Sequence, residues 1–369
     1  MKSILFISAT NGSDWGGSEE QWFRLALWMA NEKYNVAISC FEWSGKKEKL
    51  NTLKSEGVKL FLLPSKSKGV FAKWQLQKLI NKIPFESYDL VFINQGGFED
   101  VSHSPFKTIY KRCKKYVISS HNYNENGKLS AGRTSLLKKW FLNSLLNIGA
   151  SQKIFDTLEK HYQIPVPNQK IIYSPINFFV PAIQESYPSL DDNKVIFTML
   201  ATFDVNRKAQ DVLIKSFSTE RWKSRNFELH LYGQGKDFNL LGGLINENGL
   251  NEKVILKGQT ADVKKALVAT HMYLQITKLD AMPISVMEAM AMARPCIISK
   301  VGDMPVWINH EENGYISSAV TVDAIDEILE LAWQQKDQWS EMGRKAFKKF
   351  KELYPHPYEE KIVSVLKLV

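Results

Sequence analysis

The sequence predicts an α/β protein with two domains, each built around a parallel β-sheet. Its 369 residues are enough for about two domains. Short apolar runs alternate with helical patterns along most of the chain, which is typical of parallel sheets. The alternation lapses once, around Asn177 to Asn193, where Pro, Ser and Asp accumulate and an interdomain linker is expected.

The first half contains six predicted strands: Ser3–Ala9, Asn35–Phe41, Val58–Leu63, Leu90–Asn94, Tyr116–Ser120 and Ile171–Ser174. The helices predicted between them include Glu19–Asn31, Phe71–Ile83 and Thr134–Leu146.

The second half contains five predicted strands: Val195–Ala201, Phe227–Tyr232, Val254–Lys257, Met272–Thr277 and Cys296–Ser299. A last helix, roughly Pro357 to Leu368, follows a Pro-broken stretch. Two Rossmann-like halves fit this organisation. Because open parallel sheets bind ligands beyond the carboxyl ends of their strands, we expect the site in a cleft between the halves.

The composition is that of an ordinary soluble globular protein, with 44% hydrophobic and 24% charged residues. Cys40, Cys113 and Cys296 are scattered and lack metal-ligand spacing, so we interpret them as reduced thiols of a cytoplasmic protein. The apolar run Ile4 to Ala9 is too short for a signal peptide or a membrane span.

Positive charge is concentrated in the first half of the chain. Residues 1–180 carry 25 Lys and Arg against 14 Asp and Glu, a balance of +11, whereas the remainder carries 23 against 25, a balance of −2. Nine basic residues lie between Lys107 and Lys139, opposed by Glu125 alone. Apolar side chains are interleaved with them: Phe106, Tyr110, Leu136, Leu137, Trp140 and Phe141. Two interpretations stay open, a solvated basic face and peripheral contact with anionic lipid at the inner face of a membrane. Nucleic acid is not an expected partner, because no recognised binding motif accompanies the charge.

The stretch Asp280 to Lys300 is the most informative part of the chain. Between Ala281 and Ala293 only Ser285 and Glu288 have polar side chains. A segment that is apolar on every side belongs in an interior, where a carboxylate is costly unless it is hydrogen-bonded.

The spacing of these residues favours a ligand at a helix N-terminus. Ser285 and Glu288 are three apart and share one face of a helix, and Pro283 suits its first turn. Asp280 and Glu288 would then bracket the positive end of the helix, where hydroxyls and phosphates bind. Spacing alone leaves an alternative, in which Asp280 caps the helix and Glu288 pairs with an internal Arg or Lys.

These residues resemble the signature of retaining glycosyltransferases of the GT4 type (glycosyl transferases group 1), which have the GT-B fold. That pattern is an acid, seven residues and a Glu, then a small-residue helix, a Pro-led strand and a Gly loop. Here it is Asp280 and Glu288, Arg294-Pro295-Cys296, and Gly302-Asp303. The family has Glu first and a double Gly in the loop, so Asp280 keeps the charge but shortens the reach by one methylene.

The resemblance implies two Rossmann-like domains with parallel sheets facing across a cleft. Residues 1–177 would form the acceptor-side domain and 178–355 the nucleotide-sugar domain. Residues 356–369 would form a helix that packs back on the first domain.

Gly16 and Gly17 follow the first strand and open a helix. Glycines there let backbone N–H groups approach an anion, although a plain loop explains them equally well. By resemblance, Gly16 and Gly17 would approach the donor diphosphate, whereas Ser18 and Glu20 would lie towards the acceptor.

Arg207 and Lys208 are adjacent cations near the carboxyl end of a predicted strand. Such a pair suits a diphosphate, and an exposed basic turn is the alternative. The family pattern is Gly-Arg, a short loop and Lys-Gly. Lys208 matches its Lys, Thr202 stands where the Arg is expected, and Arg207 would restore that charge.

His121 directly follows a predicted strand, a position that by itself favours a structural or surface role. The resemblance places it near the donor sugar and acceptor, where it would position hydroxyls. Gly233 and Gly258 end strands at turns that need close backbone approach or positive φ. By resemblance, Gly233 lines the donor site and the loop with Gln259 borders the nucleotide base.

The implied reaction is transfer of a hexose-type sugar from a UDP- or GDP-sugar to a saccharide or lipid-linked hydroxyl, with retained configuration, in polysaccharide or glycolipid assembly. Glu288 would bind the ribose, and Asp280 with the backbone at Met282, Pro283 and Ile284 would hold the sugar. Arg207, Lys208 and the helix dipole would stabilise the leaving diphosphate without a metal or cofactor.

Two other functions remain open, a sugar-nucleotide epimerase on the same fold and a catalytically silent binding protein. The second alternative is considered because Thr202, Asp280 and Asp303 depart from the family pattern. A pyridine-nucleotide dehydrogenase is disfavoured, because no GxGxxG follows the first strand.

Overall fold

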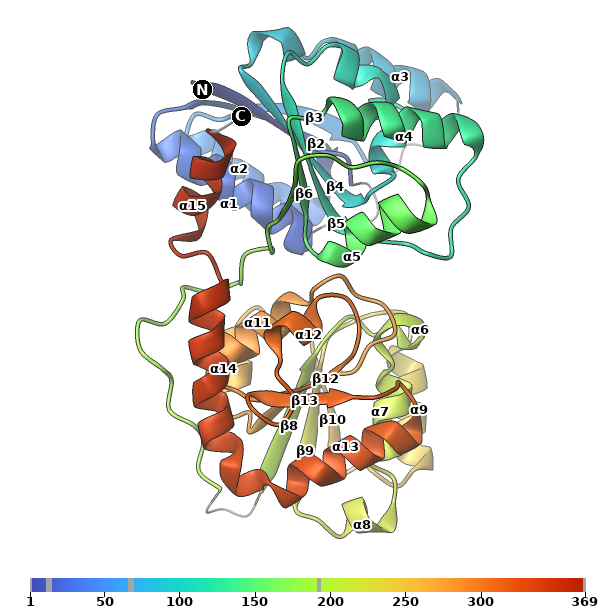
Figure 1. Ribbon diagram of the computed structural model, residues 1–369, viewed down its shortest axis with the longest axis vertical. Helices are drawn as coiled ribbons and strands as arrows, with labels where there is room; N and C mark the ends of the chain where they lie inside the picture. The colour runs from blue at the N-terminus through green and yellow to red at the C-terminus, as the bar shows by residue number, and fades with distance from the viewer. Residues whose placement is uncertain (1, 11–14, 66–69, 191–193, 368–369) are drawn as a thin grey trace. The chain divides into compact units, whose positions relative to one another are not determined.

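The computed structural model describes residues 2–10, 15–65, 70–190 and 194–367. The chain forms two compact units (Figure 1). Unit 1 comprises residues 1–175 and 355–369, and unit 2 comprises residues 176–354. Each unit is built on a parallel sheet with helices, so the predicted α/β class is confirmed.

The sheet of unit 1 has seven parallel strands in the order β3-β2-β1-β4-β5-β6-β7. Their bounds are β1 Ser3–Ser8, β2 Asn35–Glu42, β3 Lys59–Pro64, β4 Leu90–Gly97, β5 Tyr116–Asn122, β6 Leu146–Gly149 and β7 Gln169–Ile171. All six residues of β1 are buried, as expected for a central strand covered on both faces. Strand β6 was not predicted, and its first residue, Leu146, was placed at the end of the predicted helix Thr134–Leu146.

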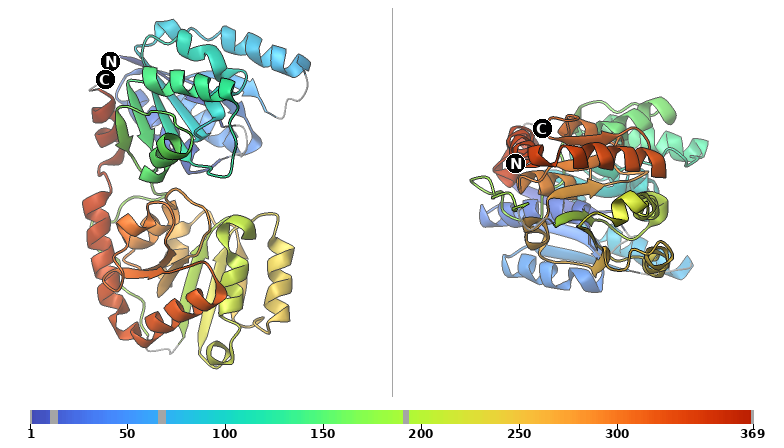
Figure 2. Two further views of the ribbon diagram at one scale, coloured as in Figure 1. Left: turned by 45° about the vertical axis from the view of Figure 1, so that its right-hand side comes forward. Right: turned by 90° about the horizontal axis from the view of Figure 1, so that it is seen from below.

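The helices of unit 1 form a layer on each face of its sheet (Figures 1 and 2). On one face lie α1 (Gly17–Asn31), α2 (Lys47–Ser55) and α15 (Tyr358–Leu366), and on the other lie α3 (Val70–Asn81) and α4 (Ala131–Asn143). The short α5 (Gln152–Asp156) follows β6. The last helix packs on α1, where the Tyr358 hydroxyl accepts a 3.1 Å bond from Gln21 Nε2 and donates a 2.8 Å bond to the Tyr173 carbonyl.

The sheet of unit 2 has six parallel strands in the order β10-β9-β8-β11-β12-β13. Their bounds are β8 Val195–Leu200, β9 Phe227–Tyr232, β10 Val254–Gly258, β11 Met272–Gln275, β12 Cys296–Ser299 and β13 Gly314–Ser317. The order repeats that of the first six strands of unit 1, with β8 in the place of β1. Strand β13, an edge strand of four residues, was not predicted.

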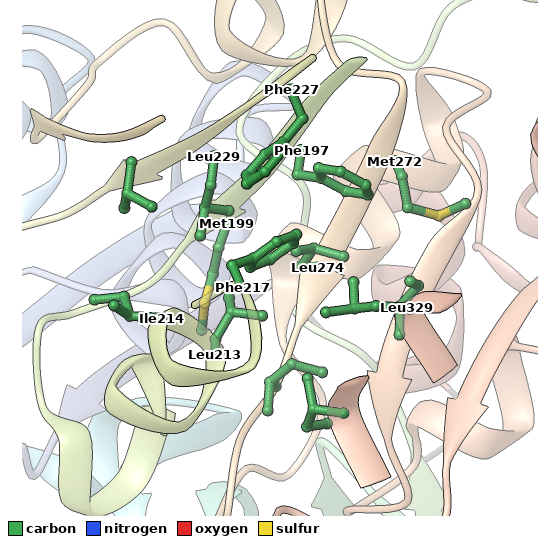
Figure 3. Close-up of a cluster of buried hydrophobic side chains, with 14 of the residues drawn as sticks. Phe197, Met199, Leu213, Ile214, Phe217, Phe227, Leu229, Met272, Leu274 and Leu329 are labelled. Atoms are coloured by element: carbon green, nitrogen blue, oxygen red, sulfur yellow. The ribbon is translucent and has the colours of Figure 1, made fainter. Parts of the chain in front are cut away.

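Helices cover both faces of this sheet as well (Figure 1). One layer contains α7 (Gln210–Ser216), α9 (Phe238–Glu247) and α13 (Val322–Gln334), and the other contains α10 (Val263–Val268), α11 (Ile284–Ala291), α12 (Met304–Trp307) and α14 (Trp339–Leu353). Two further short helices are α6 (Val205–Lys208) and α8 (Glu220–Lys223). Figure 3 shows the core under the first layer, where Phe197 of β8 and Phe227 of β9 meet Phe217 at the end of α7.

The segment predicted as a linker begins inside unit 2. Residues 176–190 contain no helix or strand, and 191–193 lie outside the described residues. The main-chain N–H of Ile176 donates a 3.1 Å bond to the Tyr354 hydroxyl. The start of this segment is therefore tied to the end of α14.

The apolar residues of the basic stretch 107–139 and its flanks belong mainly to the core of unit 1. Phe106, Leu137 and Trp140 are almost fully buried, and Tyr110 packs on Trp140 at a ring distance of 5.2 Å. Packing therefore explains the amphipathic pattern that suggested a lipid-facing surface. Contact with a membrane stays a prediction that rests on the basic residues alone. Among the residues that the structure describes, no helix is long and apolar enough to cross a membrane.

Candidate active site

Glu288 is a buried carboxylate on α11, with 2% of its surface exposed. Its Oε1 accepts two hydrogen bonds from Asn177, a 2.9 Å bond from the main-chain N–H and a 2.8 Å bond from Nδ2. Burial raises the pKa of Glu288, and the two Asn177 donors oppose this shift. Asn177 was not predicted as a site residue, because in the sequence it appears at the start of a polar, Pro-containing stretch.

The alternative partner for Glu288, an interior cation, is not what the structure shows. Arg294 is fully buried nearby in the sequence, but its guanidinium donates to the carbonyls of Leu267 and Ser186 at 2.9 Å and of Val268 at 3.1 Å. No salt bridge to Glu288 is recorded within the described ranges. The carboxyl group of Glu288 is therefore held by the two Asn177 N–H donors and not by a cation.

Asp280 forms an ion pair with Lys208 and does not cap α11. The helix begins at Ile284, and its N-cap residue is Pro283, which makes no side-chain capping bond. The Lys208 ammonium contacts Asp280 Oδ2, and the two side chains retain 14% and 16% exposure. The predicted residues Lys208 and Asp280 are thus brought together from positions 72 residues apart.

The position of Lys208 is fixed by bonds between the end of α6 and the loop after β11. The Arg207 carbonyl accepts 2.7 Å bonds from Thr277 Oγ1 and from the Lys278 N–H. Ala209, directly after Lys208, has φ of +48° and is fully buried. This left-handed residue ends α6 and starts α7.

Gly302 holds the backbone of the Asp280 loop from the other side. Its φ is +56°, and a Cβ at this position would lie 2.4 Å from the Asp280 carbonyl oxygen and 2.1 Å from that of Ala281. The next residue, Asp303, donates its N–H to the Ala281 carbonyl at 2.8 Å. Only the first residue of the expected double glycine therefore has to be Gly in this chain, because only Gly302 makes the close approach.

Gly233 supports the loop that leads to Lys208. A Cβ on Gly233 would lie 2.0 Å from the Ala201 carbonyl oxygen. Three other predicted positions have exposed side chains: Thr202, Arg207 and Gln259. Within the described residues, neither the Arg207 nor the Gln259 side chain forms a hydrogen bond or an ion pair, so neither is held at the Lys208–Asp280 pair.

The start of α11 is close-packed. Met282 and Pro283 are buried, and Ile284 is half-buried. The Ser285 hydroxyl donates to Gln275 Oε1 at 3.1 Å, and the Tyr273 hydroxyl donates to the same oxygen at 2.8 Å. Ser285 thus lies one turn before Glu288 as predicted, but it bonds to the sheet.

In unit 1, His121 lies in the last part of β5 beside three polar side chains, those of Asn94, Ser174 and Ser119, and the Ser119 hydroxyl is 3.2 Å from the imidazole Nε2. Its Nε2 is 2.8 Å from Asn94 Oδ1, and its Nδ1 is 3.2 Å from the Ser174 hydroxyl. Burial lowers the pKa of His121 to about 3, so the imidazole is neutral at pH 7. An Nε2–H tautomer satisfies both contacts, with Asn94 accepting and Ser174 donating.

Gly16 and Gly17 open α1, with Gly16 as the N-cap in an extended conformation. The predicted acceptor residues Ser18 and Glu20 lie in the first turn. Ser18 donates a 2.5 Å bond to Glu19 Oε2, and Glu20 pairs with Lys49 at 2.6 Å. Glu19 was not predicted, although it is the fully buried carboxylate of this turn.

No group of three or more His, Cys, Asp or Glu with the geometry of a metal site occurs within the described part of the chain. In that part of the chain, the largely buried cation of the unit 2 site is the Lys208 ammonium, and two exposed cations lie close by, Arg207 within α6 and Lys278 beside it.

Comparison with known proteins gives the same family for unit 2. Residues 183–349 match the model of the family described as Glycosyl transferases group 1. The chain is 24% identical over 238 residues to N-acetyl-alpha-D-glucosaminyl L-malate synthase of Bacillus anthracis, covering 60% of this chain and 61% of the relative. It is 24% identical over 252 residues to Poly(ribitol-phosphate) alpha-N-acetylglucosaminyltransferase of Staphylococcus aureus, covering 67% of this chain and 43% of the relative. The chain thus aligns with less than two thirds of the length of either relative.

Solved structures share the fold over nearly the whole chain. A glycosyltransferase from Rickettsia africae has a TM-score of 0.74 and 17% identity, with 99% of this chain and 97% of that chain covered. HepE from Anabaena in complex with UDP has a TM-score of 0.77 and 16% identity, with both chains fully covered. Residues 183–349 therefore match the glycosyl transferases group 1 family, and the chain has the GT-B fold that these solved structures share.

Proposed function

We propose that the protein transfers a sugar from a nucleoside-diphosphate donor to a hydroxyl acceptor, with retention of the anomeric configuration and without a metal ion. The observation that carries the proposal is Glu288, a buried carboxylate held by Asn177 amides without a neighbouring cation. Burying a carboxylate without a paired cation is costly even when it is hydrogen-bonded, and groups of this kind concentrate at functional sites. Ribose hydroxyls, which donate hydrogen bonds, suit its second oxygen.

Lys208 is the second part of the donor site. Its ammonium is largely buried beside Asp280 and lies where α6 ends. A largely buried cation stabilises the charge that develops on a departing diphosphate more strongly than an exposed one, because less water screens it. In this proposal Lys208 binds the diphosphate and Asp280 accepts hydrogen bonds from sugar hydroxyls. Binding of the donor would therefore break the Lys208–Asp280 ion pair that exists in the free protein.

A uridine donor is the form of the proposal that the neighbours support. HepE has been solved with UDP and with UDP-glucose, and TarM of S. aureus with UDP and alpha-GlcNAc-glycerol. At 14–16% identity these structures share only the fold with this chain, so the uridine preference is a proposal.

His121 contributes as a neutral group. With a pKa of about 3 it is neutral at pH 7, and its tautomer is fixed by Asn94 and Ser174. A neutral imidazole in such a network positions hydroxyls but does not supply charge. The proton of the acceptor hydroxyl would then leave with the departing phosphate and not through His121.

The test is nucleotide binding followed by turnover. We expect UDP, compared with GDP and ADP, to raise the unfolding temperature, and a UDP-sugar to be consumed only when an acceptor is present. Lys208→Ala should lower turnover by about 10²–10³-fold, since it removes one preorganised donor to developing charge.

Lys215→Ala is the matched control, because Lys215 is an exposed lysine of α7. Near-normal turnover in Lys208→Ala would refute the site. UDP binding without turnover on any acceptor would identify a binding protein, and consumption of a UDP-sugar without acceptor would point to an epimerase.

A further inference from the structure

Lys46 is a fully buried lysine without a partner. It ends the short 3₁₀ turn Ser44–Lys46, which follows β2, and none of its side-chain surface is exposed. Its ammonium makes no hydrogen bond to any described residue. Burying an unpaired ammonium is expensive, so this position is expected to serve an anion or a strong acceptor.

The strand register places Lys46 near the first turn of α1. Ile7 of β1 pairs with Ser39 of β2, so Ser8 and Cys40 point to the same face of the sheet. Ser8 donates a 3.2 Å bond to Glu19 of α1, and Cys40 therefore lies beneath that turn. Burial raises the pKa of the Cys40 thiol to about 12, with the Lys46 ammonium opposing and the Glu19 carboxylate adding to the shift. Both charges thus act on the same thiol.

Lys49, three residues after Lys46, also indicates that this segment lies close to the start of α1. Its ammonium pairs with Glu20 at 2.6 Å and lies 4.6 Å from the ring centre of Phe23. The start of α2 therefore packs against the start of α1. Lys46 and Lys49 approach the same end of α1, where backbone N–H groups and the helix dipole favour anions.

Two more buried polar atoms along this edge lack partners among the described residues: Thr10 Oγ1 and Asn94 Nδ2. Thr10 comes two residues after β1, and Asn94 pairs with Ser8 across β1 and β4. Lys46 and Thr10 thus follow the adjacent strands β2 and β1, and Asn94 lies within the next strand, β4. Two strand spacings separate the outer pair, a span of roughly 10 Å.

We propose that this edge of unit 1 binds an acceptor that carries an oxyanion, a phosphate or a carboxylate, with Lys46 and the N-terminus of α1 contacting the oxyanion. The proposal rests on the proposed transfer reaction and names the class of its acceptor. Asn94 Oδ1 lies 2.8 Å from His121 Nε2, so the reacting hydroxyl would lie at the Asn94 end.

Among the described residues, three carboxylates near this edge oppose an anion. Glu42 and Glu19 both act on the Cys40 thiol, and Asp100 lies beside Gly96, which approaches Thr10. Glu19 is the fully buried carboxylate in the first turn of α1. Its oxygens accept from Ser8 at 3.2 Å and from Ser18 at 2.5 Å, and no salt bridge between Glu19 and Lys46 is recorded. Because Coulomb energy falls with distance, an anion in contact with Lys46 gains more from that ammonium than it loses to a carboxylate farther away.

The experiment uses inorganic phosphate as the probe, with sodium chloride added to keep ionic strength constant. We expect phosphate to raise the unfolding temperature of the full-length protein in a saturable way, and acetate to do so more weakly. Lys46→Met should weaken the apparent phosphate affinity at least about tenfold, the effect of losing one charge-assisted hydrogen bond. Lys46→Arg should retain the response, which guards against a simple folding defect.

Two controls separate this site from its surroundings. Lys47→Met removes the adjacent lysine, which is exposed, and should leave the phosphate response unchanged. A response abolished by Lys208→Ala but kept in Lys46→Met would belong to the donor site and overturn the proposal, as would a response absent from the unmodified protein. Binding of UDP is scored separately. If Glu288→Gln lost UDP binding and Lys46→Met kept it, the donor site would be supported. This conclusion would not depend on the outcome of the phosphate experiment.

Discussion

At the scale of single residues, Glu288 is the position where burial and charge conflict most. Burial raises the pKa of its carboxyl above the ordinary value of 4.5, so the folded state binds this proton more tightly than the unfolded chain. Stability from this group is therefore full below about pH 4.5 and is lost as pH rises through the raised pKa. Ionisation of Glu288 in the folded protein therefore lowers stability.

Glu288→Gln should separate stability from binding. The glutamine Oε1 accepts from Asn177 as the carboxylate does, but a neutral amide has no proton to lose. We expect the variant to lack part of the loss of stability that the parent shows as pH rises from 4.5 to 8, and to bind UDP at least about tenfold more weakly. Thermal unfolding across this range, with and without UDP, measures both. Parallel pH curves for the two proteins would contradict the interpretation of Glu288 as a strained charge.

His121, in unit 1, should make stability depend on pH with the opposite sign. Its pKa falls from 6.5 to about 3 through burial, so the unfolded chain takes up this proton first. Stability is complete above pH 6.5 and declines as pH falls towards 3, by up to about 1.4 kcal/mol per pH unit. In His121→Gln this part of the decline should be absent, and urea unfolding at pH 7.5 and 5.5 tests it. An equal loss in both proteins would show that His121 is protonated in the folded state.

At the scale of elements, the Gly302 turn positions Asp280 through backbone contact. An alanine Cβ would lie within 2.4 Å of two carbonyl oxygens, and the φ of +56° is unfavourable for any L side chain. We expect Gly302→Ala to lower stability by about 2 kcal/mol or more, and to lower turnover further because the Asp280 loop must move away from Lys208.

Gly242→Ala is the matched control for that substitution. Gly242 lies inside α9, and no atom is within 4 Å of its added Cβ, so the change should raise stability by about 0.5–1 kcal/mol. Urea unfolding of both variants, with turnover measured alongside, checks the pair. Normal turnover in Gly302→Ala would show that the loop does not position Asp280.

The strands with clear apolar runs could be predicted from the sequence, often to the residue: Phe227–Tyr232 and Cys296–Ser299 were placed at their observed bounds. Strands β6 and β13 could not, because each has four residues and a glycine, and their pairing comes from the neighbouring strand. The same limit applies to the site. Asp280 and Glu288 stand out as acids in an apolar stretch, whereas Asn177 and Lys46 acquire their meaning from contacts or burial that no local pattern encodes.

At the scale of the whole molecule, the chain passes from unit 2 back to unit 1 within a few residues, and two tyrosines mark the two sides. Tyr354 belongs to unit 2 and its hydroxyl accepts from the Ile176 N–H at 3.1 Å, next to the residue that binds Glu288. Tyr358, four positions later, belongs to unit 1 and bonds to Gln21 and Tyr173. Removing each hydroxyl in turn therefore tests whether the stability of one unit changes without a change in the other.

Tyr358→Phe keeps a ring that is 2% exposed but removes the hydroxyl, which should cost about 1–3 kcal/mol because a buried partner loses its bond. We expect amide hydrogen exchange to quicken in α1 and α15 and to stay unchanged in α13, whereas Tyr354→Phe should quicken exchange at residues 176–177 and weaken UDP binding through Asn177. Because each substitution removes only a hydroxyl, which bonds to Gln21 and Tyr173 in one case and to Ile176 in the other, the exchange map reports which unit each hydroxyl supports. If Tyr358→Phe quickened exchange equally in α1 and α13, the last helix would be stabilising both units, and the division of the chain at residue 355 would be wrong.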